Sequence, residues 1–299
     1  MSRIVYVNGS FVPFEEATIP IMDRGFLFAD GIYEVSAVIG GRLVDNDAHL
    51  ARLDRSLAAI RIPNPYSLSE WIGLEEQLVA RNGVQEGLVY MQVTRGVAER
   101  DFAFPKETAP TIVMFTQVKR LTDSPAAETG IAVITVPDLR WARRDIKSTA
   151  LLAQVLAKQA AAEAGVAEAW MIEDGHVTEG GSSSAFIITA DRCIVTRPLS
   201  TAILPGITRQ TVMRMADEAQ LRVEERPFTV DEAHEAAEVF LTSASMLVMP
   251  IVTIDGRPVG NGKPGPLVRR LRSIYLDLAT EPKTGPQDLA AGTRTSEEG

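Results

Sequence analysis

The chain has 299 residues, of which 45% are hydrophobic and 23% charged, so it can bury a sizeable core and form two domains or one large one. This composition excludes fibrous and globally disordered proteins. The formal net charge of -9 at pH 7 disfavours attraction to nucleic acid and to anionic membranes, so we expect neither as a partner. The sequence shows no apolar signal segment and no bilayer-spanning run, which predicts a cytoplasmic location.

The first part of the chain is predicted to form a hairpin, a strand and a helix. Asn8-Gly9 between two short β-branched runs indicates a tight turn. Residues 33–38 have the pattern of a strand. Residues 45–59 place leucines on one helical face, and the Asp and Asn residues at their start are expected to cap that helix.

A second helix and two strands complete the predicted N-terminal domain. Ser67 and Glu70 form a capping-box pattern at the start of the helix, which is expected to end near Gly83. Residues 88–94 and 111–117 are predicted strands.

A polar stretch that contains Pro125 separates two richly patterned regions and predicts a domain boundary. The predicted organisation is a small N-terminal α/β domain at 1–120, a linker at 121–129, a large C-terminal domain at 130–279 and a disordered tail at 280–299.

The C-terminal domain is predicted to mix strands and helices. Residues 148–164 and 207–220 have helical patterns. Glu173-Asp174-Gly175 predicts a hairpin whose second strand ends at Glu179. A further hairpin is expected at Asp255-Gly256, after a second capping-box pattern at residues 229–232.

Lys147 and Glu179 have the surroundings that a pyridoxal phosphate enzyme requires. Lys147 is predicted to lie just before a helix, and Glu179 leads into a loop of glycines and serines. A lysine amine can form a Schiff base with the aldehyde of this cofactor, and an acidic side chain keeps the pyridine nitrogen protonated. His49, His176 and His234 lack the spacing of metal ligands, so we expect no metal site.

Motifs along the whole chain strengthen this hypothesis. They are Asp23-Arg24-Gly25 to Tyr33-Glu34, Arg52, Val93-Thr94-Arg95-Gly96, Asp145-Ile146-Lys147-Ser148, Thr178-Glu179-Gly180 and Gly206-Ile207-Thr208-Arg209. Together these motifs resemble the class IV aminotransferases, which have the fold type IV pyridoxal phosphate architecture, and most of all the bacterial D-amino acid aminotransferases of that class. The likeness extends from about residue 4 to about residue 278 with motif order and spacing kept.

The resemblance implies an α/β (α+β type) fold of two domains with pyridoxal 5'-phosphate held between them. Lys147 matches the Schiff-base lysine that also moves the proton, and Glu179 matches the partner of the pyridine nitrogen. The other positions implied to bind the cofactor, chiefly at its phosphate, are Arg52, Ser182, Ser183, Ile207, Thr208, Ser243 and Ala244.

The substrate positions implied by the resemblance are Tyr33, Val35, Arg100 and Phe102. In the D-amino acid enzymes a tyrosine, an arginine and a histidine hold the α-carboxylate, and a partner subunit contributes the last two. Here Phe102 stands at the histidine position, and its ring cannot hydrogen-bond a carboxylate. A less polar pocket suits hydrophobic acids or amines without a carboxylate.

The resemblance thus implies ping-pong transamination from a D-amino acid such as D-alanine to 2-oxoglutarate, by a homodimer with shared active sites. Three other enzymes fit the same lysine and glutamate: a branched-chain L-amino acid aminotransferase, an (R)-selective amine transaminase and an aminodeoxychorismate lyase. A protein that only carries the cofactor fits less well, since a carrier does not need a residue that makes the ring an electron sink.

Overall fold

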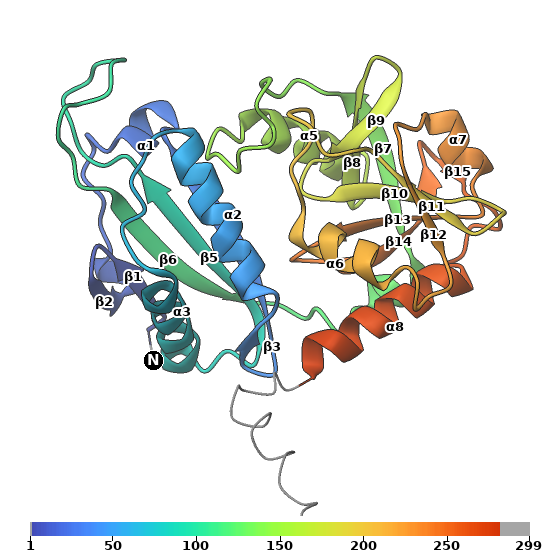
Figure 1. Cartoon of the computed structure of the whole chain (residues 1–299), viewed down its shortest axis with the longest axis horizontal. Helices are drawn as coiled ribbons and strands as arrows, with labels where there is room; N and C mark the ends of the chain where they lie inside the picture. The colour runs from blue at the N-terminus through green and yellow to red at the C-terminus, as the bar shows by residue number, and fades with distance from the viewer. Residues whose placement is uncertain (1, 282–299) are drawn as a thin grey trace, which may run out of the picture.

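The computed structural model describes residues 2–281, which form two halves, each built on a β-sheet (Figure 1). The predicted tail at 280–299 lies, apart from its first two residues, outside the described residues. The sheet of the N-terminal half has six strands in the order β2-β1-β6-β5-β3-β4. Its elements are β1 (Ile4–Val7), β2 (Ser10–Pro13), η1 (Phe14–Glu16), α1 (Arg24–Phe28), β3 (Gly31–Ile39), β4 (Arg42–Leu43), α2 (Asn46–Ala59), α3 (Leu68–Asn82), β5 (Glu86–Thr94) and β6 (Thr111–Val118).

The C-terminal half contains a nine-stranded sheet in the order β12-β11-β10-β13-β14-β7-β8-β9, with β15 paired to β14. Parallel and antiparallel pairs occur in this one sheet, which fits the predicted α+β class. Its elements are α4 (Pro125–Thr129), β7 (Ile131–Pro137), α5 (Leu152–Glu163), β8 (Glu168–Glu173), β9 (His176–Gly180), β10 (Ser184–Ile188), β11 (Cys193–Thr196), α6 (Ile207–Met215), β12 (Arg222–Glu225), α7 (Val230–Glu235), β13 (Glu238–Ser243), β14 (Leu247–Ile254), β15 (Arg257–Pro258) and α8 (Pro266–Thr280).

Turns and caps form where the local sequence predicts them. Both central residues of the hairpins at Asn8-Gly9, Asp174-Gly175 and Asp255-Gly256 have positive φ, the conformation that Asn, Asp and Gly adopt most readily. The capping boxes of α3 and α7 are both complete, with side-chain and backbone bonds in each direction. These predictions are confirmed.

Three predicted helix features are wrong. The helix expected from residue 148 begins at Leu152, because the preceding residues pair with β3 instead. The helix expected to reach residue 220 ends at Met215, and the chain turns through Gln220, whose φ is 57°. Asp45 does not cap α2, since its carboxylate accepts hydrogen bonds from Thr211 and Tyr275 in the other half.

Apolar packing holds the two halves together. One cluster of buried residues joins Ala37 and Leu88 of the N-terminal sheet to Phe186 and Phe240 of the C-terminal sheet. A second cluster lies inside the N-terminal half, where α2 buries the leucines of its apolar face completely or nearly so. Burial of one such side chain contributes about 1.5–3 kcal/mol to folding. Because the two sheets share a core at one end, the space between their other ends has walls from both halves.

Among residues 2–281, none of the helices combines the length and apolar character that a bilayer-spanning segment needs.

A buried carboxyl group of α3, hydrogen-bonded to α2, gives a prediction about stability. Glu75 is 1% exposed and accepts a hydrogen bond from Asn46 Nδ2 at 2.7 Å. Burial raises the pKa of Glu75 from 4.5 to about 8, and Glu34 and Glu76 act in the same direction. Because the folded state binds this proton more tightly than the unfolded state, the contribution of Glu75 to stability is full below pH 4.5 and is lost as the pH rises to about 8.

We therefore expect Glu75→Gln to match the unsubstituted protein at pH 5 and to be more stable at pH 9 by about 1–5 kcal/mol. Urea unfolding at the two pH values measures this difference. Glu218→Gln, at an exposed position, serves as the control and should change stability little at either pH. A gain of the same size at both pH values would show that the charge of Glu75 is not its cause.

Candidate active site

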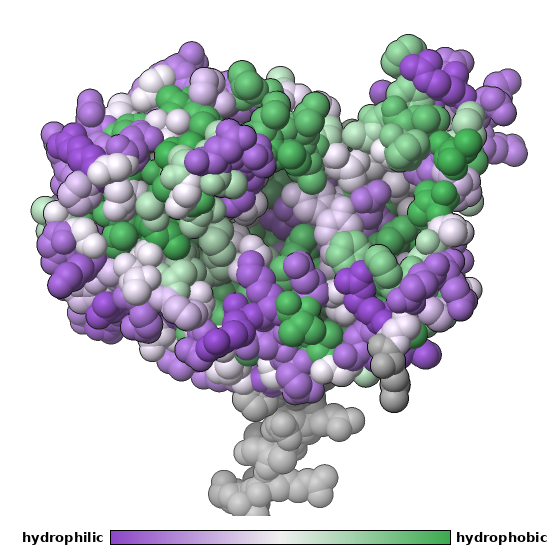
Figure 2. Space-filling view, turned by 180° about the vertical axis from the view of Figure 1, so that it is seen from behind, coloured by the Kyte–Doolittle hydropathy of each residue, from purple (hydrophilic) through white to green (hydrophobic). Residues whose placement is uncertain are grey.

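A cavity of about 380 Å³ lies between the two halves and receives side chains from both. The space-filling view from behind shows the surface hollowed between the two lobes (Figure 2). Most predicted site residues line this cavity: Tyr33, Val35, Arg52, Lys147, Glu179, Ser182, Ser183, Ile207, Thr208, Ser243 and Ala244. The first and last of them are more than 200 positions apart in the chain, and the fold brings them together.

Lys147 is held against the edge of β3 by backbone hydrogen bonds. Tyr33 N donates to Lys147 O at 2.9 Å, and Thr149 N donates to Gly31 O at 3.0 Å. Lys147 Nζ lies 4.3 Å from the centroid of the Tyr33 ring. The extended segment therefore fixes the lysine backbone to the N-terminal sheet, while the amine projects into the cavity between the halves.

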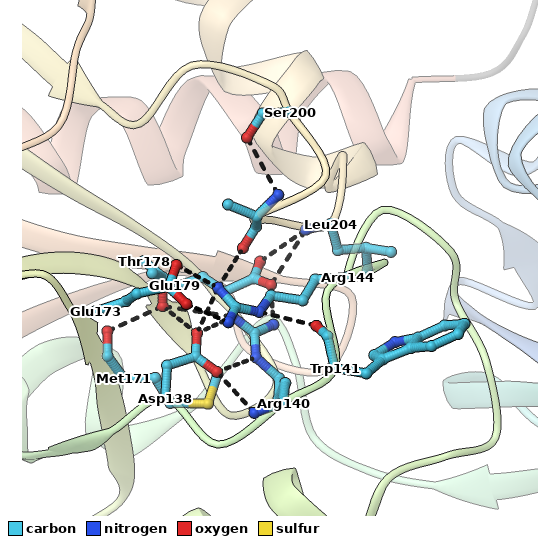
Figure 3. A network of polar contacts seen from close by, with 11 residues as sticks. Asp138, Arg140, Trp141, Arg144, Met171, Glu173, Thr178, Glu179, Ser200 and Leu204 are labelled. Atoms are coloured by element: carbon cyan, nitrogen blue, oxygen red, sulfur yellow. Dashed lines mark hydrogen bonds and ion pairs between the residues drawn. The ribbon is translucent and has the colours of Figure 1, made fainter.

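Glu179 is the penultimate residue of β9, and its carboxylate is buried in the cavity wall. Leu204 N donates to it at 3.1 Å, and the Arg140 guanidinium forms an ion pair with it (Figure 3). Burial raises the pKa of Glu179, and the charge of Arg140 acts in the opposite direction. An anion held here can pair with a positively charged or protonated ring nitrogen.

Arg140 lines the cavity, although no sequence pattern assigned it a role. Its guanidinium lies between the carboxylates of Asp138 and Glu179, with Nη2 2.6 Å from Asp138 Oδ2 (Figure 3). Thr178 Oγ1 donates to Asp138 at 2.7 Å, and Arg144 pairs with Asp138 and Glu173. An Asp two residues before an Arg predicts only a local pair; the contact with Glu179 spans 39 positions.

The start of α6 forms one end of the cavity, apart from Lys147 and Glu179. The N-cap is Gly206, and within the described part of the chain no side chain caps this helix. The first amide groups of an α-helix have no intrahelical acceptor, so those of Ile207 and Thr208 favour an anion. A Cβ at Gly206 would lie 2.7 Å from Ser184 Oγ, so a side chain there would clash.

The opposite wall of this end is the turn between β13 and β14. Ser243 and Ala244 line the cavity there, and the buried Oγ1 of Thr242 has no hydrogen-bond partner among the described residues. An unpaired buried hydroxyl costs about 1–3 kcal/mol, which a ligand oxygen would recover. The donors at this end of the cavity therefore fit a phosphate group.

Arg52 approaches the same end from α2. Glu34 accepts hydrogen bonds from its Nε at 2.7 Å and its Nη2 at 2.8 Å, and Pro205 O accepts one from Nη1 at 2.9 Å. A guanidinium has five N–H groups, so two stay available for an anion. Burial alone would raise the pKa of Glu34, but Arg52, with a hydrogen bond from His49, holds that pKa far below its usual range.

Ser182 and Ser183 line the cavity but donate their hydroxyl groups to Glu168, both at 3.1 Å. Glu168 is fully buried. In the structure as described, these two serines therefore shape the loop after Glu179, and their contact with a cofactor stays a prediction.

Arg100 and Phe102 lie apart from this cavity, on the exposed segment between β5 and β6. Phe102 is 79% exposed and packs on Phe28, with 5.5 Å between the ring centroids. The guanidinium carbon of Arg100 lies 5.4 Å from the centroid of Phe28. Neither residue is among the described residues that line the cavity of their own chain, so a contact with its substrate would need a second copy.

Comparison with known proteins decides the family. The family model "Amino-transferase class IV" matches residues 31–254, which include the lysine, the glutamate and the start of α6. This chain is a class IV aminotransferase. It therefore uses pyridoxal 5'-phosphate, and the residues around the cavity fit that cofactor: an amine at Lys147, a carboxylate at Glu179 and an anion cradle at α6.

Similar class IV aminotransferases cover nearly the whole chain. The D-alanine aminotransferase of Staphylococcus aureus (strain MSSA476) is 41% identical over 274 residues, which are 91% of this chain and 96% of that protein. The D-alanine aminotransferase of Bacillus licheniformis is 39% identical over 269 residues, or 90% and 94% of the two chains.

Solved structures share the fold. A T.th. branched-chain amino acid aminotransferase with pyridoxamine 5'-phosphate has a TM-score of 0.87 and 25% identity, covering 93% of this chain and 95% of that chain. The Escherichia coli branched-chain enzyme has a TM-score of 0.88 at 22% identity, covering 95% and 98%. The predicted fold type IV architecture is confirmed.

Proposed function

We propose that this aminotransferase moves the amino group of a D-amino acid such as D-alanine to a 2-oxo acid such as 2-oxoglutarate. The relatives named D-alanine aminotransferase support this substrate class, at about 40% identity over nine tenths of the chain. The observation that carries the proposal is a single cavity in which Lys147, Glu179 and the α6 anion cradle meet.

The cofactor would be held at three points of the cavity. Arg52, Ile207, Thr208, Ser243 and Ala244 would bind its phosphate, with Ser182 and Ser183 in the adjoining loop. Glu179 would pair with its ring nitrogen, and Lys147 would be its covalent anchor. When bound, pyridoxal phosphate supplies a carbonyl carbon that amines attack and a ring that accepts the electron pair from the substrate α-carbon.

Lys147 would carry the proton between the substrate α-carbon and the cofactor, because its amine lines the cavity beside both. The adjacent Tyr33 ring limits the volume in which Lys147 Nζ can move. This restriction lowers the entropy cost of placing the amine at the reacting carbon. Glu179 must stay ionised to stabilise positive charge on the ring nitrogen. Arg140 favours that state although the carboxylate is buried.

The substrate carboxylate would bind on the Tyr33 side of the cavity, where Val35 forms part of the wall. Arg100 is exposed and separate from its own cavity, which supports a homodimer in which a second copy supplies Arg100 and Phe102. A ring at position 102 gives one carboxylate donor fewer than a histidine would.

A branched-chain L-amino acid aminotransferase is the second candidate, because the solved structures similar to this fold include such enzymes at 25% identity. The two candidates differ in the hand of the donor, so donors of both hands are needed to separate them. Phe102 also makes amines without a carboxylate worth testing as donors.

Absorbance of the bound cofactor tests the proposal directly. The cofactor-loaded protein is titrated separately with D-alanine, L-leucine and (R)-1-phenylethylamine, with no 2-oxo acid present. We expect D-alanine to bleach the visible band and the other two to leave it. Bleaching by L-leucine alone would replace the proposal with the branched-chain function, and bleaching by the amine alone would indicate an amine transaminase.

A further inference from the structure

Lys119 and Gln154 face the cavity from opposite halves of the molecule. Lys119 directly follows β6, and its backbone N donates to Glu86 O at 3.3 Å. Gln154 lies in the first turn of α5, one helical turn before Lys158 and so on the same face of that helix. Neither residue belongs to the resemblance or to the cofactor positions described above.

Both side chains have unused polar capacity. Lys119 is exposed to solvent at the cavity and forms no ion pair within residues 2–281, whereas the neighbouring cation Lys158 pairs with Glu168 at 3.2 Å. The buried Oε1 of Gln154 has no hydrogen-bond partner among the described residues. The two atoms of an amide end are interchangeable by rotation, so Gln154 can equally present its Nε2–H donors to the cavity.

The electrostatic surroundings of Lys119 favour an anion. Its pKa lies below the ordinary value because the amine has lost part of its hydration and because the ammonium of Lys158 is near. A carboxylate placed beside Lys119 would offset the repulsion between the ammonium groups of Lys119 and Lys158. It would also replace the lost interaction of the Lys119 ammonium with water.

Strand register separates this position from the α-carboxylate side. Tyr33 pairs with Gln92, whereas Ala37, four residues further along β3, pairs with Leu88 and Leu88 pairs with Gln117. Lys119 follows two residues beyond Gln117. Lys119 and Tyr33 therefore approach the cavity from different levels of the sheet, and their long side chains converge there because both residues line it.

We propose that Lys119, assisted by Gln154, binds the distal carboxylate of a dicarboxylic 2-oxo acid and so makes this cavity selective for acceptors such as 2-oxoglutarate over monocarboxylic ones such as pyruvate. The inference rests on the proposed transamination. It names the class of 2-oxo acid that accepts the amino group in the second half-reaction. Lys119 is a specificity residue that contacts substrate, with no part in proton transfer.

The test uses the amino half of the reaction cycle. Enzyme carrying the cofactor in its amino form is mixed with 2-oxoglutarate or pyruvate, and return of the visible band gives kcat/KM for each. Lys119→Met should lower kcat/KM for 2-oxoglutarate by about 10- to 100-fold, the loss of one charge-assisted hydrogen bond, and change that for pyruvate less than about twofold. Lys119→Arg should keep most of the preference, because it keeps the charge.

Lys263→Met is the matched control, since Lys263 is exposed and lies outside the cavity lining. Gln154→Leu should lower kcat/KM for 2-oxoglutarate by a smaller factor, about 3- to 10-fold. A second readout needs no turnover: calorimetric binding of glutarate, a dicarboxylate with no oxo group, should weaken in Lys119→Met, while binding of propionate should not.

Two results would overturn the inference and leave the proposed function standing. One is an equal loss for both acceptors in Lys119→Met, which would show a general effect on the site. The other is an unchanged preference for 2-oxoglutarate with unchanged glutarate binding. If the unsubstituted enzyme returned the visible band with neither acceptor, the proposed function would fail and the inference with it.

Discussion

Lys147→Ala should lower transamination by roughly 10⁴-fold or more, because it removes both the covalent anchor and the proton carrier from one position. The amine has no substitute in the cavity wall at that point. The other amine of the wall, that of Lys119, approaches from a different level of the sheet. Guanidinium groups such as those of Arg52 and Arg140 are paired with carboxylates and do not lose protons near neutral pH. Single-turnover mixing with D-alanine measures the loss at saturating substrate.

Two further variants make this result specific. Lys147→Arg keeps the positive charge and should be as inactive as the alanine variant, since a guanidinium neither forms the covalent link nor accepts the proton. Lys263→Ala, at an exposed position, should keep full activity. A small primary amine added to Lys147→Ala should restore part of the rate. More than about a tenth of the original rate in Lys147→Ala without added amine would contradict the role given to Lys147.

Glu179→Gln should reduce kcat by about 10²- to 10³-fold with a much smaller change in KM for the amino donor. The amide keeps the size of the side chain, and its oxygen can still accept from Leu204 N, which donates at 3.1 Å in the structure. It has no charge, so it cannot stabilise a protonated ring nitrogen. Glu179→Asp keeps the charge on a shorter side chain and should lose less.

Arg140→Met tests whether the ion pair sustains that charge. Without the guanidinium, burial and the charge of Asp138 raise the pKa of Glu179 with the Leu204 hydrogen bond left to oppose them, so that pKa should rise further. The kcat of Arg140→Met should therefore fall, and the fall should be steepest at low pH, where the carboxyl takes up a proton. Combined with Glu179→Gln, the substitution should add little, since both act through one charge. Full additivity of the two losses would place Arg140 in a separate role.

The residues of the candidate site divide according to how they could be found. Lys147 and Glu179 stand out because a lysine and a glutamate in those motifs resemble a family with known chemistry, and the family match confirms the resemblance. Arg140 and Lys119 have no such signal: each is one of 30 lysines and arginines. Their place in the cavity wall depends on how β7 and β6 end relative to α5 and β9, which no local pattern encodes.

The sequence alone determined the local structure of this protein. The positive φ of Asn8 and Asp174, the two capping boxes and the leucine face of α2 follow from interactions within a few residues, because dihedral preference and helical periodicity act at that range. The family and its cofactor also followed from motif order.

The tertiary structure decided the rest. The segment before α5 has a helical composition, yet residues 147–149 give their hydrogen bonds to β3, which lies more than 100 positions earlier. Arg52 fits the polar face of an amphipathic helix, yet it is buried against Glu34 and the loop before α6. In each case one long-range partner satisfies a backbone or charged group that burial would otherwise leave unpaired, and that requirement outweighs local preference once the two halves pack together.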